Sequence, residues 1–240
     1  QTPHNAPEHF TGDRACIPHS HYNPYVEAFW KWWPDLYKDL KHFRMTGGEP
    51  LMDKNTYKVF DYINANPKSD LHLNVTSNFS VEDKLFDKYI EAIKPICLDE
   101  KVEHFMQYVS VDAWWEKAEY IRNGLDFNRM WDNVHRFLTE VPYRNSITFI
   151  ITYNNLSVTS IDQLLGAIHA LREMYSDTYQ RIWFDTPLLR QPRWQSIQLL
   201  PESYQMIHDD ATCWMLDNME DEKTRFKGFK DYEIQRMHRD

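Results

Sequence analysis

The chain has 240 residues, of which 42% are hydrophobic and 15% aromatic, and its formal net charge is −9. This size allows one domain with a substantial core. The negative charge excludes the basic footprint of a general nucleic-acid-binding protein, and no apolar run in the sequence reaches the roughly 20 residues of a membrane span. The cysteines, Cys16, Cys97 and Cys213, lie far apart, so they predict no disulfide framework and favour a reducing, cytoplasmic compartment.

Residues 1–41 are expected to form an irregular loop followed by an aromatic helix. The helix is predicted over about Tyr25–Leu40, with a break near Pro34 because proline removes a backbone donor.

Within the first loop, Cys16-x2-His19-x-His21 resembles a trio of metal ligands. Histidine and cysteine are common ligands, but this spacing matches no standard zinc pattern. We therefore expect no metal site in this loop.

Residues 42–200 alternate between short β-prone runs and amphipathic helical runs. Strands are expected at 42–46, 71–76, 106–112, 147–153 and 180–185, and helices at about 55–66, 83–94, 129–141 and 160–175. Such alternation predicts an α/β fold with a parallel sheet and right-handed crossovers. The pattern alone leaves open whether the sheet is doubly wound or part of a barrel.

Residues 201–240 are expected to form a C-terminal helical tail. A helix is predicted from about Pro201 to Met219. The highly charged segment after it, Asp221–Asp240, is expected to be a solvated helix or a frayed terminus.

Polar residues stand at the ends of four predicted strands. They are Gly47, Gly48 and Glu49; Thr76, Ser77 and Asn78; Ser110 and Asp112; and Thr152 and Asn154. Ligands of parallel α/β folds bind at the carboxyl ends of strands, so the coincidence predicts a binding site. Singly, each has a local alternative: Asp112 can cap the next helix, and Asn78 and Asn154 can form Asx turns.

The most informative of these motifs is Gly47-Gly48-Glu49-Pro50. Two glycines at a strand end permit positive φ or a close approach to a ligand, and Pro50 fixes the chain that follows. Glu49 is then held beside exposed backbone carbonyls, which suits the capture of an ammonium group. An ordinary βα turn is the alternative interpretation.

His42–Leu51 resembles the second strand and the Gly-Gly-Glu-Pro motif of radical S-adenosylmethionine (SAM) enzymes. Further resemblances follow in the family's order: Leu71–Asn78 to the third strand, Gln107–Asp112 to the fourth, Glu119–Phe127 to an Arg-x-Gly stretch, Ile147–Asn154 to the fifth strand and Gln180–Thr186 to the sixth. The resemblance is closest to the peptide-modifying SPASM/twitch-type branch. It implies a partial, TIM-type (β/α)6 barrel with about five βα units present.

The resemblance also implies a cofactor, a reaction and partners. SAM would be cleaved reductively to a 5′-deoxyadenosyl radical that abstracts hydrogen from a peptide or small substrate. The electron would come from a [4Fe–4S] cluster served by a reductant such as flavodoxin or ferredoxin.

The resemblance assigns SAM-binding roles to matching positions. Gly47, Gly48, Glu49 and Pro50 would receive the methionine ammonium group, Ser110 the ribose or methionine, and Arg122 the methionine carboxylate; Thr76, Asn78 and Asp112 would face SAM or substrate, and Asn154 the adenine. For Arg122, an ion pair with Glu119 or Asp126 is the alternative. The family's Gly-x-Ile-x-Gly-x-x-Glu signature is absent from the fifth strand, so the resemblance implies only that this strand, up to Asn154, flanks the adenine.

One departure from the family pattern is large. The Cys-x3-Cys-x2-Cys loop that holds the family's cluster is missing, and Cys213 alone cannot hold an auxiliary cluster. Two explanations remain open: a fragment whose cluster loop lies upstream, which would be inactive alone, or a cluster-free relative that serves as a binding module. A hydrolase or transferase using Asp112 and Glu49 as acid and base is a third possibility, disfavoured because no nucleophile pairing is evident.

Overall fold

The structure is a computed structural model that describes residues 22–187, 189 and 191–238. The candidate metal ligands Cys16, His19 and His21 lie outside these described residues. The chain divides into two compact units, Gln1–Leu40 and Lys41–Asp240. Among the described residues, no helix is both long and apolar enough to cross a membrane.

The first unit contains helix α1 (Pro24–Asp39). The predicted break near Pro34 is wrong, because Pro34 lies inside a continuous helix. Aromatic side chains at helical spacing support this stretch: the Trp30 and Trp33 rings lie 5.9 Å apart, and the Trp33 and Tyr37 rings 5.5 Å apart. These contacts offset the hydrogen bond that proline cannot make.

The second unit is built on a parallel sheet. Within the described residues it has five strands: β1 (His42–Met45), β2 (Lys68–Ser77), β3 (Val102–Ser110), β4 (Asn145–Ile150) and β5 (Ile182–Asp185). All neighbouring strands are parallel, as predicted, and they lie in chain order from β1 to β5. Chain order is compatible with part of a β/α barrel wall, whereas a doubly wound sheet reverses its order at a switch point.

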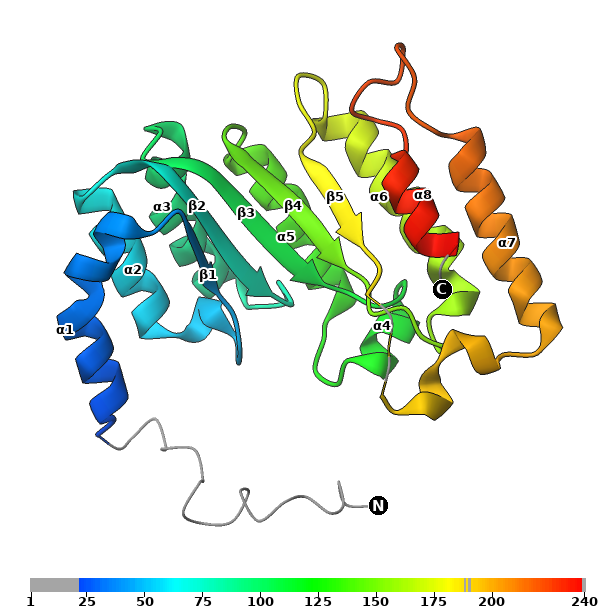
Figure 1. Cartoon of the computed structure of the whole chain (residues 1–240), viewed down its shortest axis with the longest axis horizontal. Helices are drawn as coiled ribbons and strands as arrows, with labels where there is room; N and C mark the ends of the chain where they lie inside the picture. Colours follow the sequence, from blue (N-terminus) through cyan, green and yellow to red (C-terminus); the bar gives the residue numbers. More distant parts are fainter. Residues whose placement is uncertain (1–21, 188, 190, 239–240) are drawn as a thin grey trace. The chain divides into compact units, whose positions relative to one another are not determined.

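Helices follow the strands in the order that the sequence predicts. They are α2 (Lys54–Ala65), α3 (Asp83–Leu98), α4 (Glu116–Ile121), α5 (Phe127–Glu140), α6 (Ile161–Tyr175), α7 (Glu202–Asp217) and α8 (Asp231–His238). Figure 1 shows α2, α3, α5 and α6 together behind the sheet, so its other face has no helix from this group. The structure is therefore an α/β fold in which these four helices cover one sheet face. On the opposite face, which we call the uncovered face, α8 contacts the edge strand β5.

The core lies between the sheet and these helices. Residues of a strand point alternately to its two faces, and on the helix-covered face the side chains of Leu73, Phe105 and Phe149 are completely buried. The ring of Phe105 lies 6.2 Å from that of Phe137 in α5. Even a polar residue on this face is satisfied, since the Tyr89 hydroxyl donates to the buried side-chain oxygen of Gln107. The helix-covered face is thus fully used for packing.

The C-terminal segment differs from the sequence-based expectation. Asp221–Asp240 was expected to be solvated, but α8 places the Glu233 side chain, 0% exposed, against the equally buried Arg172 of α6. The Arg172 guanidinium donates from Nη2 to Glu233 Oε1 at 2.6 Å and from Nη1 to Oε2 at 3.1 Å. A buried bidentate ion pair therefore ties α8 to α6, and Arg172 also donates to the Ile182 carbonyl of β5. Figure 1 shows α8 beside β5.

Candidate functional site

The turn after β1 has the backbone shape that its glycines predict. Gly47 has φ of +89° and Gly48 has φ of +56°, the left-handed region that other residues rarely adopt. A Cβ built on either glycine would meet no other atom within 4 Å. The turn therefore has open space on its outer side, and its backbone can approach a ligand closely.

Glu49 joins the ends of the first two strands. Its Oε1 accepts a hydrogen bond from the Leu51 amide at 3.1 Å, and its Oε2 accepts one from the Asn78 amide at 3.3 Å. Pro50 begins the short 3-10 helix η3 (Pro50–Met52), which Glu49 caps. One backbone amide on each oxygen leaves acceptor capacity for a bound cation.

The buried Tyr57 lies close to the Glu49 carboxylate. Burial, and secondarily the negative charge of Glu49, raise the pKa of Tyr57 to about 12. The Tyr57 hydroxyl donates to the Leu51 carbonyl at 2.7 Å. Tyr57 thus supports the turn as a neutral donor rather than as a titrating group.

Asp112 and Arg122 are brought together at the carboxyl end of the sheet. Asp112 Oδ2 lies 2.8 Å from Arg122 Nε, and Arg122 Nη2 donates to Oδ1 at 3.0 Å. The Thr152 amide also donates to Oδ1, at 2.8 Å. The alternative partners Glu119 and Asp126 are wrong: they receive the Phe127 and Arg129 amides instead. Asp112 therefore occupies Nε and Nη2 of Arg122. To bind a ligand carboxylate, Arg122 would have to use Nη1 or exchange Asp112 for the ligand.

The two asparagines at the strand ends form Asx turns, as the alternative interpretation predicts. Asn78 Oδ1 accepts from the Ser80 amide, and Asn154 Oδ1 accepts from the Leu156 amide, each at 2.9 Å. These side chains shape the loops after β2 and β4. Asn154 is only 4% exposed, so it is poorly placed for direct contact with a ligand.

Thr76 and Ser110 occupy the sheet face opposite the covering helices. The Thr76 hydroxyl accepts a hydrogen bond from Arg44 Nε at 3.1 Å. Ser110, the last residue of β3, is half-buried and pairs in register with Ile150 of β4. All the predicted site residues therefore lie at or just beyond the carboxyl ends of the strands, although Asp112, Asn78 and Asn154 also hold the fold together there.

Sequence reasoning missed the uncovered sheet face, which is formed by alternate residues in matching register. Its successive layers are His42, His72 and His104; then Arg44, Asn74 and Met106; then Thr76, Tyr108, Thr148 and Trp183. Strands of a parallel sheet covered on both sides are apolar on both sides, so the polar residues at alternate positions of β2, His72, Asn74 and Thr76, were the available signal.

Contacts within these layers confirm that their side chains share one face. The His42 and His72 rings stack with centroids 4.7 Å apart, and the Thr148 hydroxyl contacts Met106 Sδ at 3.0 Å. Burial, with a smaller effect from the neighbouring His72, lowers the pKa of His104. The uncovered face is therefore an ordered polar surface rather than an exposed core.

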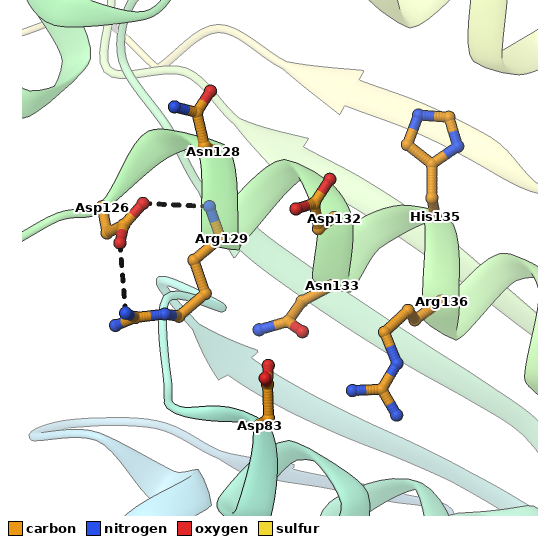
Figure 2. Close-up of a pocket in the computed structure, with 8 residues that line it drawn as sticks. All are labelled: Asp83, Asp126, Asn128, Arg129, Asp132, Asn133, His135 and Arg136. Atoms are coloured by element: carbon orange, nitrogen blue, oxygen red, sulfur yellow. Dashed lines mark hydrogen bonds and ion pairs between the residues drawn. The ribbon is translucent and has the colours of Figure 1, made fainter.

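A shallow polar groove of about 780 Å³ lies along α5 (Figure 2). Some of its charged groups pair with one another: Asp126 accepts from the Arg129 amide at 3.0 Å and pairs with its guanidinium at 3.3 Å, as Figure 2 shows. Asn133 in the groove donates to the carbonyls of Phe79 and Val81. We assign no ligand to this groove.

The cysteines within the described residues do not form an iron site. Burial in α3 raises the pKa of Cys97 to about 12, whereas Cys213 is exposed on α7. No group of three or more histidine, cysteine or acidic side chains is placed to hold a metal ion in this part of the chain.

Comparison with known proteins adds no relative: no protein-family model matches the chain, and no curated protein matches it.

Proposed function

We propose that this chain is the SAM-binding part of a radical SAM enzyme. The observation that carries the proposal is the Gly47-Gly48-Glu49 turn. It is held in a left-handed conformation, with open space outside it, at the carboxyl end of a parallel sheet whose strands run in chain order. The dispersed cysteines favour a reducing, cytoplasmic setting for such an enzyme.

The donor set of the turn fits the ammonium group of SAM. Backbone carbonyls at two glycines and the Glu49 carboxylate supply acceptors of the sign and kind that an ammonium requires. Because Glu49 is fixed by the Leu51 and Asn78 amides, its carboxylate is oriented before the ligand arrives. This preorganisation reduces the entropy lost on binding.

Other residues at the strand ends would complete the cradle. Ser110 presents a hydroxyl at the end of β3, and Arg122 lies across the end of the sheet with its guanidinium held by Asp112. Arg122 would reach the methionine carboxylate through Nη1, or by exchanging Asp112 for it, while Ser110 would contact the ribose or methionine.

Bound SAM, when cleaved by one-electron reduction, supplies a 5′-deoxyadenosyl radical that abstracts hydrogen from a peptide or small substrate. The chain's own residues would bind and orient SAM. The described cysteines do not fit the iron–sulfur cluster, so no step through that cluster is derived from this structure.

Binding of SAM to the chain tests the cradle directly. Equilibrium dialysis would compare SAM with 5′-methylthioadenosine, which keeps the nucleoside but lacks the ammonium and carboxylate groups. We expect saturable binding of SAM and weaker binding of 5′-methylthioadenosine. Equal binding of the two compounds, or no saturable binding of SAM, would overturn the proposal.

Two glycine variants sharpen this measurement. Gly47→Ala places a methyl group on a residue whose φ is +89°. Gly166→Ala is the control: Gly166 lies in α6, its φ is not positive, and the space around it is equally open. An L-residue in the left-handed region costs about 1–2 kcal/mol, so we expect Gly47→Ala to weaken SAM binding about tenfold through displacement of the turn. Gly166→Ala should leave the dissociation constant unchanged.

The catalytic part of the proposal requires the protein isolated anaerobically from its natural source. Bound iron, with formation of 5′-deoxyadenosine on reduction, is the expected result. SAM binding without either would instead identify a cluster-free binding module.

A further inference from the structure

On the uncovered sheet face, Arg44 is a cation held in place by uncharged neighbours. Its Nε donates to the Thr76 hydroxyl at 3.1 Å, and its guanidinium carbon lies 4.1 Å from the centre of the Tyr108 ring. Both contacts are within the range of a good hydrogen bond and a cation–π interaction. Neighbouring strands thus fix the orientation of an otherwise exposed side chain.

No carboxylate pairs with Arg44 in the part of the chain that the structure describes. The surrounding positions on β1–β3 are neutral or basic: His42, His72 and His104 in one layer, and Asn74 and Met106 beside Arg44. Asp185 on β5, an acidic residue of this face, is paired with Arg236 of α8. The positive charge of Arg44 is therefore not neutralised by these neighbours.

The orientation of Arg44 leaves its two terminal nitrogens for another partner. Nε donates to Thr76, and the guanidinium carbon lies over the Tyr108 ring. Parallel N–H groups of a guanidinium match two oxygens of a carboxylate or phosphate, which gives a geometry that lysine cannot reproduce. Because the guanidinium is already ordered, a ligand loses little additional side-chain entropy on binding.

We propose that Arg44, oriented by Thr76 and Tyr108, is an oxyanion subsite on the uncovered sheet face and takes a carboxylate or phosphate group of the substrate. That the bound molecule is a substrate rests on the proposed function; the oxyanion subsite itself does not. Thr76 lies one register layer nearer the carboxyl end than Arg44. A substrate held here would thus sit below the Gly47-Gly48 turn, on the same sheet.

Calorimetric titration of the chain with two probes tests the subsite. The probes are inorganic pyrophosphate and the dipeptide acetyl-Ala-Ala, compared with its uncharged amide. We expect saturable binding of at least one anion and none of the amide. Binding of pyrophosphate alone would indicate a substrate with a phosphate group, and binding of the free dipeptide alone would indicate a substrate with a carboxylate. Binding of neither would overturn the inference.

A matched arginine distinguishes a built subsite from general positive charge. Arg225 is also exposed, lies 4.7 Å from the centre of the Phe226 ring and is remote from the sheet in sequence. We expect Arg44→Gln to weaken anion binding at least tenfold and Arg225→Gln to leave it unchanged. Equal effects of the two substitutions would overturn the inference.

Three further variants keep the test valid if Arg44→Gln disturbs folding. Arg44→Lys keeps the charge but loses the fork, so binding should weaken about tenfold. Tyr108→Phe keeps the ring and should bind as the wild type does, whereas Tyr108→Leu should bind more weakly; full binding by Arg44→Lys and Tyr108→Leu would contradict the proposed geometry.

The two proposals fail separately in these experiments. Pyrophosphate or dipeptide binding without SAM binding would overturn the proposed function and leave the oxyanion subsite. SAM binding without anion binding would overturn the subsite alone.

Discussion

Breaking the buried ion pair between α6 and α8 should destabilise the second unit strongly. In Glu233→Gln, the fully buried Arg172 keeps the carbonyls of Ile182 and Gly228 as acceptors but loses its counter-charge. Removing one partner of a buried pair costs about 3–5 kcal/mol. For a unit of this size, about 1 kcal/mol corresponds to about 2–4 °C in melting temperature, so Glu233→Gln should lower it by about 6–20 °C.

The same substitution at an exposed pair provides the control. Glu140 contacts Arg136 at 2.9 Å on the surface of α5, with the two side chains 36% and 32% exposed. A pair of this kind contributes about 0.3–0.5 kcal/mol, so Glu140→Gln should change the melting temperature by no more than about 2 °C. Thermal melts followed by circular dichroism would measure both.

A double variant separates loss of charge from loss of packing. Arg172→Met combined with Glu233→Leu removes both charges and keeps apolar volume at the site. It should recover most of the stability that Glu233→Gln loses, because apolar replacements of buried pairs are often neutral or stabilising. Equal melting temperatures for Glu233→Gln and Glu140→Gln would refute the claim that α8 is fixed by this pair.

Three further predictions follow from the site and the buried groups. Asp112→Asn should lower the free energy of unfolding by about 2 kcal/mol in urea titrations, since Arg122 loses its carboxylate; an unchanged midpoint would contradict this. Iodoacetamide at pH 8 should modify the exposed Cys213 of the native protein and spare Cys97, whose pKa burial raises to about 12, as peptide mass spectrometry would show; equal labelling would place Cys97 at the surface. Burial lowers the pKa of His104 below 6.5, so its contribution to stability is present above pH 6.5 and is lost as the pH falls below it. The urea midpoints at pH 7.5 and 5.5 should therefore differ less in His104→Asn than in the wild type. An equal difference in the two proteins would exclude this contribution.

The order and type of the elements in the second unit were predictable because local periodicity determines them. The apolar stripe Met130, Val134, Phe137 and Leu138 is buried in α5, and the expected strands appear in the expected order. Strand ends moved by a few residues because pairing, as at Lys68 of β2 with Val102 of β3, extends a strand beyond its β-prone run. Pro34 was misread because aromatic packing outweighed a local rule.

Features that depend on distant partners were not predictable from local sequence. In the sequence, Glu233 is one of many acidic residues in a charged segment, so nothing local predicts its burial. It is buried because it pairs with Arg172 of a different helix. Asp112 likewise pairs with Arg122 instead of capping a helix. Arg44 became a candidate binding residue only in the folded structure, where β2 and β3 place Thr76 and Tyr108 beside it. Register across strands, which one sequence does not display, determines each of these pairings.

The position of α8 beside β5 has a consequence for association between molecules. The Tyr232 ring of α8 stacks on Trp183 of β5, with centroids 6.4 Å apart, and the Arg236 side chain pairs with Asp185. Among the described strands, β1 is hydrogen-bonded to a strand on one side only. A sheet with two open edges can add molecules without limit, but a sheet stopped at one edge can pair only once. Arg172, held by Glu233 of α8, already donates to the Ile182 carbonyl of β5, so we expect any strand pairing with another molecule to occur at β1 rather than at β5.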